Sequence, residues 1–317
     1  MRYDMYSRPG MSYTSGFFIL MGLMGVGLIF SVAIAAGLWM VMTGTGFGSM
    51  QQEMNNPANV QVLRLLQLVS TFFMFFLPAY FTSLILSKRP LQLMGFHNRF
   101  TWRELALAIV IMLTSLPLVG ALSQLTQMIP LPASLEQTFS NWEKAYEDQV
   151  KVLSRIDSFG DYLLSLIIMA LAPAIFEETF FRGGMQNLLE KGTGKGWLAI
   201  GITAVLFSAI HFSFYGFIAR VALGVVLGLI FHYSQSLWLS IACHFFNNAL
   251  VVTQIYVLNL QGKSVDDAMK ETGPLWIGVF VLFILFGLFR FYKQYCAETR
   301  ERLMPLEDRA RTENWIA

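Results

Sequence analysis

The chain has 317 residues, of which 55% are apolar and only 13% are charged, and its mean hydropathy is +0.55. Soluble globular domains carry about 25% charged residues, so the composition excludes a soluble fold and predicts one integral membrane domain over 1–317. The formal net charge of +2 is too small to suggest a nucleic-acid partner.

Eight segments are apolar enough to suggest transmembrane helices, because a hydrocarbon core of about 30 Å needs about 20 apolar residues. In chain order they cover 17–42, 65–87, 105–125, 162–189, 197–213, 216–233, 237–258 and 274–292. The predicted fold class is therefore all-α, a polytopic membrane helical bundle of about eight transmembrane helices. Only Phe214 and Tyr215 separate the short fifth and sixth segments, so the ends of these two are the least well defined.

Two stretches lie outside the predicted spans. Residues 126–160 are acidic and carry apolar side chains at helical spacing, namely Leu135, Phe139, Trp142, Tyr146, Val150 and Leu153. This pattern predicts an external amphipathic helix that lies in the membrane interface or, alternatively, roofs a cavity. Residues 293–317 are charged and are predicted to form a cytoplasmic tail.

The distribution of Lys and Arg predicts the orientation. Of these residues in the exposed stretches, 14 lie on the side of both termini and 5 lie on the other side. Positive charge favours the cytoplasmic face, so we expect both termini in the cytoplasm. This placement requires an even number of spans.

Ionisable side chains inside a membrane are costly and are therefore functional candidates. The fourth span contains Glu177, Glu178 and Arg182, the fifth ends at His211, and the seventh contains His244. A spacing of four places Glu178 and Arg182 on one helix face, whereas Glu177 lies about 100° around the helix. We therefore expect Glu178 to pair with Arg182, which leaves Glu177 free to act as a base.

The same spacing joins Phe207 to His211 and His244 to Asn248. Phe207 is expected to form the wall of a site, and Asn247 to pack beside it or support it. The depths of the ionisable groups along their helices differ by about 10 Å, part of which helix tilt can absorb. Convergence of these helices on one site is therefore a prediction that the sequence leaves open.

Three motifs follow one another along these spans. They are Glu-Glu-x-x-x-Arg at 177–182, Phe-x-x-x-His at 207–211 and His-x-x-x-Asn at 244–248. Their order resembles the CPBP intramembrane protease family, which includes the type II CAAX prenyl endopeptidases and the bacteriocin-processing or immunity (Abi) proteins. The resemblance is confined to 161–252, the expected catalytic core, where Gly-x-x-x-Gly at 224–228 is also similar to the family.

The resemblance implies hydrolysis of a peptide bond within the membrane. The implied catalytic residues are Glu177, His211, His244 and Asn248, and the implied supporting residues are Glu178, Arg182, Phe207 and Asn247. Glu177 and His211 would polarise a water molecule. His244 and Asn248 would donate hydrogen bonds to the oxyanion.

The resemblance also suggests a cofactor and partners. The family is often described as metalloproteases, so a divalent metal such as zinc is expected at Glu177, His211 and His244, with no organic cofactor. The expected partners are a membrane-associated peptide or protein substrate and the lipid bilayer. The expected location is a bacterial cytoplasmic membrane.

Two other function classes stay open at this point. A non-catalytic membrane scaffold or bacteriocin-immunity protein of the same fold would keep the motifs and act by binding partners. A proton-coupled transporter would also place ionisable groups in the membrane. Transporters normally show repeat symmetry, whereas here the ionisable groups lie in one half of the chain.

Overall fold

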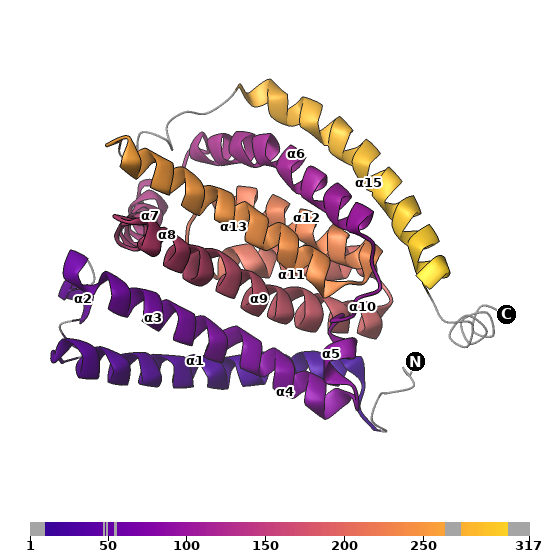
Figure 1. The fold of residues 1–317 in the computed structure, drawn as a ribbon, viewed down its shortest axis with the longest axis horizontal. Helices are drawn as coiled ribbons and strands as arrows, with labels where there is room; N and C mark the ends of the chain where they lie inside the picture. The colour runs from indigo at the N-terminus through magenta and orange to yellow at the C-terminus, as the bar shows by residue number, and fades with distance from the viewer. Residues whose placement is uncertain (1–9, 47, 49, 54–55, 264–273, 304–317) are drawn as a thin grey trace.

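The computed structural model describes residues 10–46, 48, 50–53, 56–263 and 274–303. Its regular structure in those ranges is helical, which confirms the predicted all-α fold class. Figure 1 shows the long helices lying roughly along one direction. The main helical elements are α1 (Tyr13–Thr43), α3 (Val60–Thr71), α4 (Leu77–Leu86), α6 (Trp102–Gln127), α7 (Ala133–Leu153), α8 (Phe159–Ser165), α9 (Ala172–Glu178), α10 (Asn187–Thr193), α11 (Gly196–Ala209), α12 (Phe217–Ser234), α13 (Leu237–Leu260) and α15 (Leu275–Leu303). Shorter helices are α2 (Met50–Glu53) and α5 (Pro90–Leu93).

Seven described helical stretches are long and apolar enough to cross a membrane, so the chain is a multi-pass membrane protein. The fifth predicted span, 197–213, differs from the other seven, because it becomes the 14-residue helix α11, which ends at Ala209. In Figure 1 the start of α1 and the end of α15 lie at one end of the bundle, and α2 and α7 lie at the opposite end. This arrangement agrees with an even number of crossings when α11 is counted.

The helices pack in groups around a central set (Figure 1). Helix α1 packs against α3 and α4 on one side, and α6 packs against α15 on the other. One apolar core lies where α6, α12, α13 and α15 meet, and a second joins α1 and α4 to the fourth span. The fourth span, α12 and α13 therefore occupy the interior, where a polar site can be shielded from lipid.

The fourth span is one continuous helical stretch, Phe159–Thr193, that twice departs from α geometry. The segments η4 (Leu166–Leu171) and η5 (Thr179–Gln186) are π-helical. Pro173 follows the first of them and lacks the N–H that an α-helix would use. Such wide turns re-aim side chains and are frequent at functional sites, and here they lie on both sides of the paired glutamates.

The Gly-x-x-x-Gly pattern lets α12 approach its neighbours closely. A Cβ added at Gly224 would lie 3.0 Å from Ala204 of α11, and one added at Gly228 would lie 2.9 Å from Oε1 of Gln186. Without side chains at these positions, the backbone carbonyl of Gly228 can accept a hydrogen bond of 2.9 Å from Nε2 of Gln186. Small residues thus bring polar backbone groups of α12 within reach of the fourth span.

The structure shows the secondary structure of two predicted segments outside the spans. Helix α15 continues to Leu303, so the predicted tail over 293–317 begins as an extension of the last helix, and 304–317 lie outside the described residues. The external stretch 126–160 contains α7, whereas its first two residues belong to α6. A helix can continue through charged residues, because its backbone hydrogen bonds do not depend on apolar side chains. The length of the apolar run therefore underestimated the length of α15.

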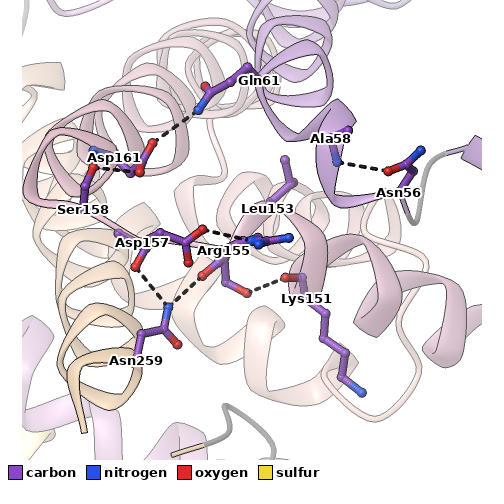
Figure 2. A network of polar contacts seen from close by, with 12 residues as sticks. Asn56, Ala58, Gln61, Lys151, Leu153, Arg155, Asp157, Ser158, Asp161 and Asn259 are labelled. Atoms are coloured by element: carbon purple, nitrogen blue, oxygen red, sulfur yellow. Dashed lines mark hydrogen bonds and ion pairs between the residues drawn. The ribbon is translucent and has the colours of Figure 1, made fainter. Parts of the chain in front are cut away.

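A polar network fastens the chain between α7 and α8. Arg64 of α3 has no exposed surface, and its Nη2 donates to the carbonyls of Leu153 at 3.2 Å and Arg155 at 2.9 Å. Figure 2 shows Gln61 of α3 reaching Asp161 of α8, and Asn259 of α13 reaching the segment that connects α7 to α8. The C-terminal end of α7 is therefore held by two transmembrane helices.

Candidate active site

The paired glutamates end α9 in the interior of the bundle. Glu178 and Arg182 have no exposed surface, and Nη1 of Arg182 donates to Oε1 of Glu178 at 2.6 Å. The predicted pairing of these two residues is thus confirmed. Glu177 is 9% exposed and takes no part in this ion pair. The two adjacent carboxylates therefore occupy different environments.

Three further contacts hold the Arg182 guanidinium in place. Its Nη2 donates to the carbonyl of Gly224 at 3.2 Å, and its Cζ lies 4.7 Å from the centre of the Phe207 ring. The Phe207 ring also meets the ring of Phe181 edge-on at 5.2 Å. A buried cation that has an anion, a carbonyl and an aromatic face around it is well compensated, so Arg182 acts as a fixed anchor.

His244 connects α13 to both glutamates. Its Nδ1 lies 2.9 Å from Oε1 of Glu178, and its Nε2 lies 4.0 Å from Oε2 of Glu177. Because an ionised carboxylate only accepts, Nδ1 of His244 carries the proton of this hydrogen bond. In the neutral imidazole the lone pair therefore lies on Nε2, which faces Glu177.

His211 follows the end of α11, on the face that Phe207 occupies. Its Nδ1 lies 2.8 Å from the carbonyl of Phe207, so Nδ1 donates and Nε2 again carries the lone pair. The Phe207 ring stands between the two imidazoles, at 5.2 Å from His211 and 5.9 Å from His244. Phe207 therefore contacts both histidines, as a residue that forms the wall of a site would.

Asn248 lies one turn beyond His244 on α13. Its Oδ1 accepts a hydrogen bond of 3.2 Å from Nδ2 of Asn247. This bond orients the Asn248 amide and leaves its Nδ2 as the group that can donate to a substrate. Among the described residues, neither a hydrogen bond nor an ion pair joins Asn248 or His211 to Glu177.

The segment that carries this constellation matches a known family. Residues 159–250 match the family model of type II CAAX prenyl endopeptidase Rce1-like proteins. The match confirms the resemblance to the CPBP family over nearly the same residues as the predicted core, 161–252. No curated protein and no solved structure gave a significant match.

The Rce1-like segment contains donors of the type that zinc prefers. His211 donates its Nδ1–H to a carbonyl, and His244 donates its Nδ1–H to a carboxylate. Both keep Nε2 free, as metal-ligating histidines do. The distances between these side chains do not suit a zinc ion. The described residues contain no group of three or more His, Cys, Asp or Glu side chains close enough together to hold one. No chemical step below is therefore assigned to a metal.

The sequence analysis missed two groups, one inside the Rce1-like segment and one outside it. The carbonyl of Gly224 holds Arg182, and the only signal for it was the Gly-x-x-x-Gly pattern. Glu143 of α7 contacts the turn that follows His211, through Ser213 and Tyr215. Its acidic side chain on an otherwise apolar helix face was the signal that could have found it.

Proposed function

We propose that this chain is an intramembrane endopeptidase that hydrolyses a peptide bond with a water molecule activated by Glu177 and His211. One observation carries the proposal: Glu178 fixes His244 through Nδ1, so that Nε2 faces Glu177 across 4.0 Å. That separation is too long for a hydrogen bond, so the carboxylate and the imidazole both stay available to reacting groups. The family match supports a CAAX-protease-like peptidase.

The proposed reaction begins with proton transfer to Glu177. Water attacks the carbonyl carbon of the scissile bond and gives a proton to the carboxylate, while the carbonyl oxygen becomes an oxyanion. Nε2 of His211, which carries a lone pair, accepts a hydrogen bond from the other O–H of this water and orients it, and that hydrogen stays on the oxygen. When the C–N bond breaks, the amine takes the proton from Glu177, and the products are a carboxylic acid and an amine.

The oxyanion needs hydrogen-bond donors on the side of the scissile carbonyl that faces away from the attacking water. Nδ2 of Asn248 is one such donor, because Oδ1 is already held by Asn247. Nε2 of His244 can donate only when both ring nitrogens carry a proton, and the bond from Nδ1 to Glu178 holds the ring in position. The buried Glu178–Arg182 pair therefore sets the position of His244.

Zinc remains a proposal that the types of donor atom support, whereas the side chains that carry them lie too far apart in the structure to hold an ion without moving. Glu177, His211 and His244 would hold the ion, which would lower the pKa of a bound water. Elemental analysis of purified protein and activity after chelation and zinc addition test it. We expect chelation to remove activity and zinc to restore it, whereas a metal-free sample with full activity would refute the proposal.

The endopeptidase proposal is tested with a farnesylated CAAX peptide and the same peptide without the lipid, because the matched family is described by that substrate. The intact protein should cleave at least one of them, and the Glu177→Gln variant should cleave neither. The physiological substrate is sought by comparing the membrane peptides of cells that express the intact protein or Glu177→Ala. Equal peptide profiles and no cleavage in vitro would exclude proteolysis.

A non-catalytic scaffold of the same fold is the rival function. It would bind partners through the same helices and would not need Glu177 as a base. The Glu177→Gln variant separates the two, because a scaffold keeps partner binding and its cellular effect, whereas a peptidase loses its effect together with cleavage.

A further inference from the structure

The turn over 210–216, between α11 and α12, carries His211 and follows a helix that is short for a membrane span. Helix α11 has 14 residues and is about 21 Å long, which is shorter than a hydrocarbon core of about 30 Å. Irregular backbone at membrane depth is tolerated only where protein or a water-filled cavity satisfies its polar groups. The turn is also strained, because Phe212, directly after His211, adopts a φ of 48°. Contacts from another part of the protein must therefore stabilise this turn.

Glu143 of α7 supplies that contact. The Ser213 hydroxyl lies 3.0 and 2.9 Å from the two carboxylate oxygens of Glu143, and the N–H of Tyr215 donates to Oε2 at 3.3 Å. Ser213 is only 4% exposed, and its hydroxyl also accepts from the N–H of Gly216 at 3.3 Å. One carboxylate thus satisfies a buried hydroxyl and a backbone N–H in the turn.

Aromatic contacts surround this carboxylate on the same face of α7. The ring of Phe139 stacks on Phe214 at 4.4 Å with an interplanar angle of 6°, and Trp142 meets Phe212 edge-on at 5.9 Å. Tyr146 lies one turn further along α7 on the same face. The centre of its ring is 4.8 Å from the Arg220 guanidinium of α12. The apolar face of α7 therefore packs on the turn, which favours a roof over this segment and not a free interfacial helix.

The other end of α7 is anchored independently. The network in Figure 2 and the buried Arg64 fix its C-terminal end to α3 and α13. Among its residues only Leu153 is buried, so the helix rests on the bundle at that anchor and at the turn. A helix fixed at one end and pressed on a strained turn at its middle can set the position of that turn.

We propose that Glu143 is a positioning residue for His211, acting through Ser213 and the N–H of Tyr215. It holds the turn in the conformation that presents Nε2 of His211 toward the water-activating site. This inference rests on the proposed function for its kinetic consequence, but the structural relation between Glu143 and His211 can be measured without cleavage.

The kinetic test compares Glu143→Ala and Glu143→Gln with the control Glu147→Ala, one helical turn away and exposed. Misplacing a catalytic group by about 1 Å can cost about 10²-fold, so we expect Glu143→Ala to lower kcat by about 10²-fold with KM unchanged. Glu143→Gln keeps one accepting oxygen and should regain most of kcat. The control should match the intact protein. Equal kcat for Glu143→Ala and the control would overturn the proposal.

A double variant tests the route through the hydroxyl. If Glu143 acts through Ser213, the double change Glu143→Ala with Ser213→Ala should lower kcat no further than Glu143→Ala alone. Losses that multiply would mean that the two side chains act independently, and this result would contradict the proposed route.

Histidine modification gives a readout that does not depend on cleavage. Diethyl pyrocarbonate labelling with peptide mapping should show faster modification of His211 in Glu143→Ala, with the rate for His232 unchanged, because His232 is held by Glu190 at 3.0 Å. If the protein cleaves no peptide, the proposed function fails but the labelling still decides the positioning role. Unchanged labelling of His211 in a folded Glu143→Ala protein would refute it. Should Glu143→Ala not fold, Ser213→Ala removes the same contact from the other side and should also make the modification of His211 faster.

Discussion

Replacing each of the adjacent glutamates by glutamine should damage the protein in different ways. Oε1 of Glu178 accepts from both Arg182 and His244, and both glutamate and arginine are fully buried. Removing one partner of a buried ion pair costs about 3–5 kcal/mol. Because Arg182 would keep the carbonyl of Gly224 and the ring of Phe207, we expect Glu178→Gln to cost about 3 kcal/mol, at the lower end of that range.

Glu177→Gln should leave stability nearly unchanged, because the nearest ionic partner of Glu177 is His244 at 4.0 Å and glutamine has the same shape. Loss of a general base lowers the rate by about 10²–10⁴-fold, so hydrolysis should nearly disappear. Combining Glu178→Gln with Arg182→Leu removes the stranded cation and should recover part of the lost stability. Activity should stay low in that double variant, because His244 loses its carboxylate.

Thermal unfolding in detergent and peptide cleavage should be measured side by side for the three variants. The expected pattern is a stable but inactive Glu177→Gln protein and a destabilised Glu178→Gln protein. If Glu177→Gln cleaves normally while Glu178→Gln is stably folded and inactive, the roles of the two carboxylates are reversed and the argument from pairing is wrong.

Three further predictions concern other parts of the molecule. Asn248→Ala should lower kcat by about 10²–10³-fold, measured with the same peptides, if its amide stabilises the oxyanion. Cysteines introduced at Glu53 and Lys263 should label from outside the cell and one at Asn98 from the cytoplasm, and labelling of all three from one side would refute the topology. Burial lowers the pKa of His97 below its usual 6.5, and its Nδ1 accepts from the N–H of Arg99 at 3.3 Å. As pH falls, His97 therefore binds a proton in the unfolded chain at a higher pH than in the folded protein. The free energy of unfolding should decrease as pH drops below about 6.5. Unfolding measurements should show a smaller decrease for His97→Gln.

The sequence determined the features that depend on one helix at a time. Apolar length located the spans, and a spacing of four residues paired Glu178 with Arg182, because the geometry of a single helix fixes which side chains share a face. The order of the motifs likewise located the segment that matches the Rce1-like family. These inferences needed no knowledge of how the helices pack.

Only the tertiary structure decided how these helices combine. The sharing of Glu178 by His244 depends on how closely α13 approaches the fourth span, and the early end of α11 depends on the turn that follows it. The docking of Glu143 on that turn joins residues about 70 positions apart, which no local pattern encodes. Periodicity indicates which face of a helix is apolar, but the partner of that face is set by packing between distant segments, and so the contacts of Phe139 and Trp142 with the turn that carries His211 appear only in the tertiary structure.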